Sequence, residues 1–124
     1  RTAKVFENLG ISYPNLFLID PLPYLEFNFL VEKAMAVITD SGGITEETTV
    51  MGVPCLTLRD NTERPETCDL GTNELVGTNP HNIPPVMEVL LSGNWRKGGI
   101  PELWDGQTSG RIIKELITIS EDNF

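Results

Sequence analysis

The sequence predicts an α/β protein with an open parallel sheet flanked by helices, and three observations lead to this fold class. Short apolar runs recur along the 124 residues, and each is followed by a loop and then by a stretch with helical spacing. The first three runs are continuously apolar, which is typical of strands covered on both faces of a parallel sheet. Strands that alternate with helices at this spacing are joined by right-handed crossovers.

The predicted strands are apolar runs that end at a polar or turn-forming residue. They comprise residues 16–19, 36–39, 55–58 and 74–76. Asp20, Asp40 and Arg59 mark the ends of the first three. Ligands of open α/β sheets bind beyond the carboxyl ends of the strands. If the strands are parallel, the loops 20–23 and 40–43 and the loop that begins at Arg59 converge on one edge of the sheet.

The segments between the strands are predicted to be helical. The expected helices cover residues 24–33, 44–51, 65–70, 84–91 and 108–119. Gly52 and Pro54 stop the second helix, and Pro84 suits a helix start. Residues 92–106, which hold many Gly, Trp and Pro, are predicted to form a loop. The segment that begins at Arg1 resembles the middle of a helix, so we expect the chain to be a piece of a longer protein.

The composition is that of one soluble globular domain, with 40% hydrophobic and 22% charged residues. The formal net charge of −9 argues against nucleic acid as a partner, because nucleic-acid binding needs a cationic face. No apolar run approaches the ~20 residues of a membrane helix. Cys55 and Cys68 do not resemble the disulfide framework of a secreted protein, and Cys55 is expected in the core. We therefore expect a cytoplasmic protein without a membrane partner.

Ser41, Gly42 and Gly43 lie between a predicted strand and a predicted helix, which is the arrangement of an anion site. The glycines let a phosphate approach the backbone, and the first amides of the helix point at it. A simple tight turn is the alternative. The run from Asp40 also resembles the nucleophile loop of chymotrypsin-type proteases. Those proteins are all-β and need a catalytic histidine, whereas the only histidine here, His81, lies in a turn-like run.

Glu46 and Glu47 are expected in the first turn of the same helix. A carboxylate there interacts favourably with the helix dipole by ~0.3–1 kcal/mol, which suffices to explain Glu46. Glu47 follows Gly43 by four residues and could share a face with the anion-facing amides. A carboxylate at that position could hold the hydroxyl groups of a ribose beside a phosphate.

Two further residues have both an ordinary and a functional interpretation. Arg64 lies in a loop with a second arginine and three acids, which is either a salt-bridged surface loop or a source of positive charge for an anion. A guanidinium matches the geometry of pyrophosphate or carboxylate. Phe27, on an amphipathic helix, is more often a core residue, but it could also flank a base.

Several motifs together resemble one family, the non-hydrolysing UDP-N-acetylglucosamine 2-epimerases, and the resemblance is to their C-terminal domain. The motifs are TDSGGITEE at residues 39–47, GVPCLTLRDNTERPE at 52–66 and GTNELVG at 71–77. PLPYLEF at residues 21–27 and the stretch from Asp105 to Ile112 resemble further family segments. The resemblance covers nearly the whole chain with consistent spacing.

The resemblance implies a GT-B-like enzyme of two Rossmann-like domains with the nucleotide sugar between them. Residues 1–124 would form a single Rossmann-like UDP-sugar-binding domain, roughly the last third of the enzyme. The family interconverts UDP-GlcNAc and UDP-ManNAc by eliminating UDP and adding it back, and this needs no redox cofactor or catalytic metal. A homodimer is expected for the full-length enzyme, and the isolated chain is expected to be inactive.

The resemblance also implies roles for individual residues. The loop 41–43 would bind the diphosphate, Glu47 the ribose hydroxyls and Arg64 the charged part of the substrate. Phe27 and the backbone near Leu22 would lie beside the uracil. Some family members carry Gln where this chain has Leu22, so only a backbone contact is expected there. No catalytic residue is expected in this chain: the acid and base carboxylates and a His-Arg-Arg-Glu-Asn motif would lie upstream.

Three alternatives remain open at this point. A GT-B glycosyltransferase also uses a glycine loop and a ribose-binding glutamate, although the TERPE run at residues 62–66 favours the epimerase. A UDP-diacetamido-uronate 2-epimerase would share the serine-glycine loop, but its family replaces Arg64 and Pro65. The third alternative is a non-catalytic module that binds nucleotide sugars.

Overall fold

A three-stranded parallel sheet forms the centre of the computed structural model, which describes residues 2–122. The strands are β1 (Val37–Thr39), β2 (Cys55–Thr57) and β3 (Asn73–Leu75), and β2 lies in the middle. Thr39 pairs with Thr57 on β2, so β1 and β2 end in register. The predicted parallel sheet is confirmed, and three of the four predicted strands lie in it.

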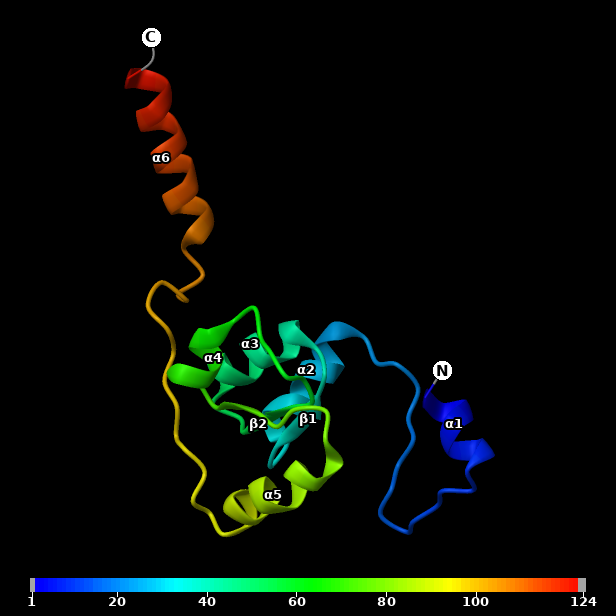
Figure 1. Cartoon of the computed structure of the whole chain (residues 1–124). Helices are drawn as coiled ribbons and strands as arrows, with labels where there is room; N and C mark the ends of the chain where they lie inside the picture. Colours follow the sequence, from blue (N-terminus) through cyan, green and yellow to red (C-terminus); the bar gives the residue numbers. More distant parts are fainter. Residues whose placement is uncertain (1, 123–124) are drawn as a thin grey trace.

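Helices lie on both faces of this sheet and also away from it. They are α1 (Thr2–Asn8), α2 (Tyr24–Lys33), α3 (Gly42–Met51), α4 (Pro65–Asp69), a 3₁₀ turn η1 (Pro80–Asn82), α5 (Ile83–Leu91) and α6 (Thr108–Asp122). Figure 1 shows α3 and α4 on one side of the sheet and α5 on the other. The predicted bounds of α2 are confirmed, whereas α3 begins two residues earlier than predicted, at Gly42.

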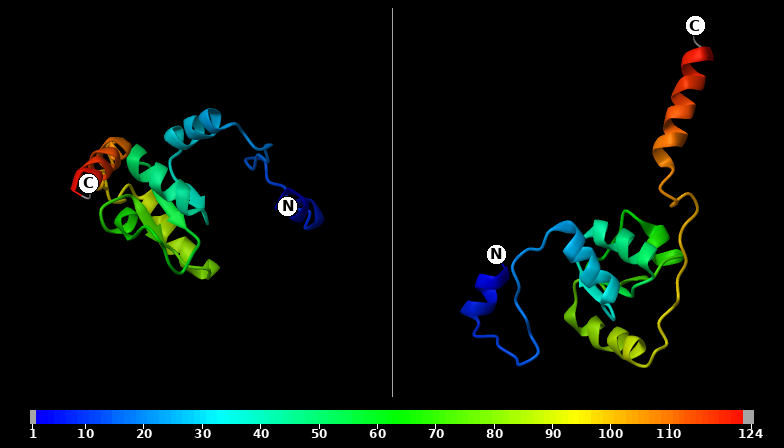
Figure 2. Two further views of the ribbon diagram at one scale, coloured as in Figure 1. Left: turned by 90° about the horizontal axis from the view of Figure 1, so that it is seen from above. Right: turned by 180° about the vertical axis from the view of Figure 1, so that it is seen from behind.

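The first predicted strand, residues 16–19, is wrong. This segment has no regular secondary structure, and the Phe17 side chain in it is 79% exposed. It lies between α1 and α2, away from the sheet in all three views (Figures 1 and 2). A strand needs a hydrogen-bonding neighbour, and the described residues offer none beside it. The loop 20–23 therefore does not leave a strand of this sheet.

Helix α6 extends away from the sheet (Figure 2) and carries an exposed apolar stripe. The stripe consists of Ile112, Ile113, Leu116 and Ile117, each more than half exposed.

Asp105, which precedes α6, accepts hydrogen bonds from Arg111 Nη1 and the Gln107 amide, both at 2.9 Å. The Arg111 bond is the main cause that lowers the pKa of Asp105 to about 2, so this carboxylate is ionised at neutral pH. No helix within residues 2–122 has the length and apolar character needed to cross a membrane.

The core under the sheet combines aliphatic residues with buried threonines. Leu56 and Cys55 on β2 are fully buried, and burial raises the pKa of the Cys55 thiol. On α3, Thr48 and Thr49 are also buried, and their hydroxyls donate to carbonyl groups of their own helix at 3.0 and 2.8 Å. Because these hydroxyls are hydrogen-bonded, their burial does not carry the free-energy cost of an unpaired polar group. Small polar side chains can therefore pack here.

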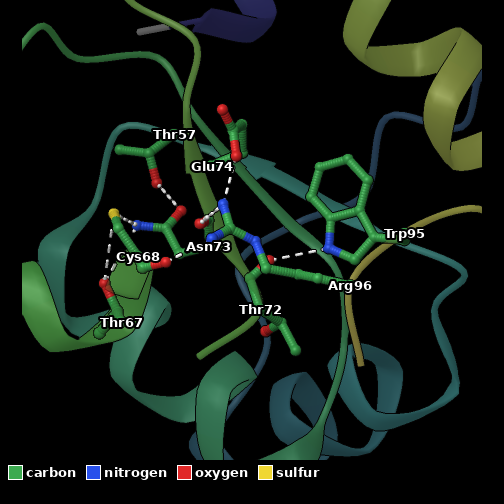
Figure 3. A network of polar contacts seen from close by, with 8 residues as sticks. All are labelled: Thr57, Thr67, Cys68, Thr72, Asn73, Glu74, Trp95 and Arg96. Carbon is green, nitrogen blue, oxygen red and sulfur yellow. Dashed lines mark hydrogen bonds and ion pairs between the residues drawn. The ribbon is translucent and has the colours of Figure 1, made fainter. Parts of the chain in front are cut away.

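A strap formed by residues 94–99 covers the outer edge of β3 (Figure 3). Trp95 Nε1 donates to the Thr72 carbonyl at 2.9 Å, and Arg96 Nη2 donates to the Asn73 carbonyl at 2.8 Å. The Gly99 amide donates to the Leu70 carbonyl at 2.6 Å. The Thr72 carbonyl also accepts from the Cys55 amide of β2 at 3.2 Å, so it faces β2. The next carbonyl, that of Asn73, faces the outer edge of β3, and there the Arg96 guanidinium takes the place of a further strand. The outer edge of β1 has no strand beside it within the described residues.

Gly98→Ala should loosen this strap. Gly98 has a φ of +64°, and an added Cβ would lie 2.8 Å from the Gly71 carbonyl carbon, so both backbone strain and a clash result. The expected loss of stability is about 2–4 kcal/mol. Urea unfolding of the full-length protein measures it.

Gly93→Ala is the matched control, because Gly93 has a φ of +74° but open space around its Cβ position. Only the strain of about 1–2 kcal/mol should remain there. Equal losses of stability in the two variants would contradict the close packing of the strap against Gly71.

Candidate functional site

The ends of β1 and β2 bring two loops together. Beyond the last strand pair, the Leu58 amide donates to the Thr39 carbonyl at 2.8 Å and extends the ladder by one residue. The loop from Asp40 to α3 and the loop from Arg59 to α4 therefore start side by side. The predicted convergence is confirmed for these two loops and is wrong for loop 20–23.

Ser41 begins α3 without capping it through its side chain. Its backbone is extended, with φ −86° and ψ 122°, and its amide donates to Thr39 Oγ1 at 3.0 Å. The first amides of an α-helix have no partner within the helix. The Ser41 hydroxyl and the amides of the first turn of α3 can therefore donate to a ligand.

Neither Gly42 nor Gly43 is required by the fold itself. Both lie in the first turn of α3, and neither has a positive φ. A Cβ on Gly43 would meet no atom within 4 Å, and one on Gly42 would meet only Arg59 Nη1 at 3.8 Å, an ordinary contact. The tight-turn interpretation therefore leaves these glycines unexplained, whereas close approach of a ligand to the backbone explains them.

The start of α3 faces a hollow of about 320 Å³, which we call the anion hollow. It is lined by Gly42, Gly43, Glu46, Arg59, Thr62, Glu63 and Arg64. Arg64 donates through Nε to Glu46, and this hydrogen bond is the main cause that raises the pKa of Arg64. Two guanidinium groups and a set of helix amides therefore surround the same space.

A second hollow of about 440 Å³ lies next to the first and shares Glu46 and Arg64 with it. We call it the nucleoside hollow, after the ribose that the sequence leads us to expect beside Glu47. Its other lining residues are Tyr24, Glu47, Val50, Met51, Glu66, Leu103, Trp104, Gly106 and Thr108. Glu47 is half-buried in a wall that is otherwise largely apolar. A space lined by helix amides and two arginines thus adjoins a space lined by apolar side chains and by Glu46, Glu47 and Glu66.

The predicted positions of Glu46 and Glu47 need a correction. Because α3 begins at Gly42, both residues lie in its second turn, beyond the reach of the dipole effect that acts in the first turn. Glu46 is instead the ion-pair partner of Arg64. Glu47 lines the nucleoside hollow and not the anion hollow, so a face shared with the anion-facing amides stays a prediction.

Leu22 and Phe27 are not brought into either hollow. Leu22 lines a separate shallow hollow with residues of α2, including Leu25 and Phe29. Phe27 is half-buried on α2. Tyr24, between them in the chain, is the α2 residue that reaches the nucleoside hollow.

The sequence argument did not select Arg59, Thr62, Tyr24 or Trp104 as site residues. Arg59 could have been selected, because it follows a predicted strand end directly. Trp104 could not, because it reaches the hollow from a loop of irregular structure, residues 92–107. No group of three or more potential metal ligands occurs among the described residues.

Comparison with known proteins identifies the family. The sequence model of the family described as UDP-N-acetylglucosamine 2-epimerase matches residues 1–117. This chain belongs to the UDP-N-acetylglucosamine 2-epimerase family. The UDP-N-acetylglucosamine 2-epimerase of Methanococcus maripaludis is 47% identical to it, over 94% of this chain and 32% of that protein.

Solved structures of the epimerase family share the fold. The Methanocaldococcus jannaschii epimerase in complex with UDP-GlcNAc and UDP is 39% identical with a TM-score of 0.78, over 93% of this chain and 31% of its own. The Neisseria meningitidis epimerase bound to UDP-GlcNAc is 36% identical with a TM-score of 0.79, over 94% and 32%. The predicted α/β, Rossmann-like fold of a GT-B-like family is confirmed, and the chain spans about a third of these relatives.

Gly43→Ala should leave the fold intact or stabilise it. Alanine in a helix is more stable than glycine by roughly 0.5–1 kcal/mol, and the Cβ position is open. The thermal unfolding midpoint of the full-length protein should stay equal or rise, while the affinity for an anionic ligand at the start of α3 falls.

Gly71→Ala provides the contrast, because its Cβ would lie 2.5 Å from Thr49 Oγ1 and the Thr67 carbonyl oxygen. That variant should unfold at a lower temperature. A comparable loss for Gly43→Ala would show that the fold, and not a ligand, requires the glycine.

Proposed function

We propose that this chain is the UDP-binding part of an enzyme that interconverts UDP-GlcNAc and UDP-ManNAc. The observation that carries the proposal is the start of α3, where two glycines that the fold does not require face two guanidinium groups. Membership of the epimerase family supports the nucleotide sugar as the ligand. Residues 1–124 would act as one UDP-sugar-binding domain.

The diphosphate would lie in the anion hollow. The amides at Gly42 and Gly43 and the Ser41 hydroxyl would donate to its oxygen atoms, as helix starts do for phosphate groups. Arg64 would contact the charged part of the substrate from the rim that the two hollows share. A local cation is needed here, because the chain as a whole has a net charge of −9.

The ribose would lie at the border of the two hollows. The ionised Glu47 carboxylate only accepts hydrogen bonds, so both ribose hydroxyls can donate to it. Leu22, through its backbone, and Phe27 are proposed as neighbours of the uracil. They flank Tyr24, which reaches the nucleoside hollow from the start of α2.

The proposed reaction eliminates UDP and later adds it back. The bond between the anomeric carbon and the diphosphate breaks, C2 loses its proton, and a 2-acetamidoglucal forms. C2 then takes up a proton on its other face, and UDP returns. No electrons are gained or lost overall, so no redox cofactor is required, and the proposal includes no catalytic metal.

In this scheme the chain holds the leaving group, and the groups that move protons at C2 belong to the rest of the enzyme. No residue of this chain is proposed as catalytic. A cytoplasmic homodimer, as expected from the sequence, stays part of the proposal.

Glu47→Ala should weaken UDP binding to the full-length protein by roughly 1–3 kcal/mol, because charged hydrogen bonds to the ribose are lost. Isothermal titration calorimetry measures this change. Glu88→Ala, which removes an exposed carboxylate from α5, is the control and should leave the affinity unaltered. Equal affinities of the Glu47 variant and the unaltered protein would contradict the role of Glu47.

The isolated chain should not epimerise UDP-GlcNAc, whereas the full-length protein should. The anomeric proton signals of UDP-GlcNAc and UDP-ManNAc in NMR spectra report the conversion. Turnover by the purified 124-residue chain would place the proton-transfer groups within it and overturn the proposed division of labour.

A further inference from the structure

Arg59 lies over the first turn of α3. It is the second residue after β2, and the Leu58 amide before it is fixed to the Thr39 carbonyl at 2.8 Å. Its Nη1 atom lies 3.8 Å from the position that a Cβ on Gly42 would occupy. The backbone of the strand end therefore directs this guanidinium toward the same amides that the proposed function assigns to the diphosphate.

The partners of Arg59 within the described residues are weak. Its Nη2 atom lies 3.5 Å from Asn61 Oδ1, at the limit of a hydrogen bond. The same atom lies 4.0 Å from Glu63 Oε1, and the Glu63 side chain is 85% exposed. Exposed ion pairs of this length contribute little.

Arg64, the other guanidinium of the anion hollow, is held differently. Its Nε donates to Glu46, and the two form an ion pair. Its Nη1 also donates to the Glu63 carbonyl at 3.2 Å. Of the two arginines that line the hollow, Arg64 is therefore paired with a carboxylate, whereas Arg59 has N–H donors available for a ligand.

The nearest counter-charge of Arg59 at this position is the exposed Glu63, at 4.0 Å. The start of a helix carries partial positive charge, so a cation there is destabilising in the absence of a counter-charge. The missing side chain of Gly42 leaves space between the guanidinium and the helix amides. A diphosphate in that space would accept from the amides on one side and from the planar guanidinium on the other.

We propose that Arg59 is a further binding residue for the diphosphate, one that positions the nucleotide across the gap left by Gly42. This inference rests on the proposed function and adds to it a residue that distinguishes a nucleoside diphosphate from a nucleoside. Arg64 binds from the rim, whereas Arg59 faces the first turn of α3.

The test compares UDP and uridine as ligands of the full-length protein by calorimetry. Arg59→Gln should lower the affinity for UDP roughly 10- to 100-fold, the effect of losing hydrogen bonds to a charged group. The affinity for uridine should stay nearly constant, because uridine has no diphosphate. Arg59→Lys keeps the charge without the planar donor pair and should recover part of the lost affinity.

Lys33→Gln is the matched control, since it removes one positive charge from the exposed end of α2. It should change neither affinity. The ratio of UDP to uridine affinity separates a contact to the diphosphate from a disturbed loop, because a disturbed loop lowers both affinities together.

A parallel loss of both affinities, or unchanged UDP binding in Arg59→Gln, would overturn the role of Arg59 while leaving the proposed function standing. Absence of UDP binding by the unaltered protein would instead overturn the proposed function, and this inference with it.

Discussion

The alignment of the ends of β1 and β2 is the constraint on which the site depends. Thr39 pairs with Thr57, and the Leu58 amide donates a hydrogen bond to the Thr39 carbonyl at 2.8 Å. Because α3 begins three residues after Thr39, this register determines which atoms face the start of α3. A slip of one residue would turn every side chain of the slipped strand to the opposite face and move Arg59 away from Gly42. Backbone pairing, rather than any single side chain, brings the anion hollow together.

A buried polar network supports the second loop of the site. Thr57 Oγ1 donates to Asn73 Oδ1 at 2.6 Å, and Asn73 Nδ2 donates to Thr67 Oγ1 at 3.1 Å (Figure 3). Thr67 Oγ1 in turn donates to the Arg64 carbonyl at 2.7 Å. The chain of bonds links β2, β3 and the start of α4, so the backbone that carries Arg64 is tied to the core. Every polar group in this network has a hydrogen-bond partner. Its burial therefore avoids the free-energy cost of an unpaired polar group, and the network favours one arrangement of the core.

Patterns of neighbouring residues in the sequence predicted most of the fold. They failed where an element depends on residues far away in the sequence. Gly52, which adopts a φ of 70°, ends α3 where the sequence placed its end. Residues 16–19 have the apolar character of a strand, but a strand exists only beside a neighbour. The sequence selected Gly42, Gly43, Glu47 and Arg64, which the structure gathers around adjoining hollows. It could not select Trp104, since no periodic pattern predicts how a long loop returns to the site.

The two edges of the sheet differ in how they would behave in solution. On β3, the Arg96 guanidinium donates to the Asn73 carbonyl, which another strand could otherwise use. On β1, the outer edge is open within the described residues, and the Ile38 side chain is 50% exposed. An open strand edge is a template for intermolecular β-pairing. When the chain is expressed alone, aggregation should therefore begin at β1, and a charged residue in place of Ile38 is the natural first change for improving its solubility.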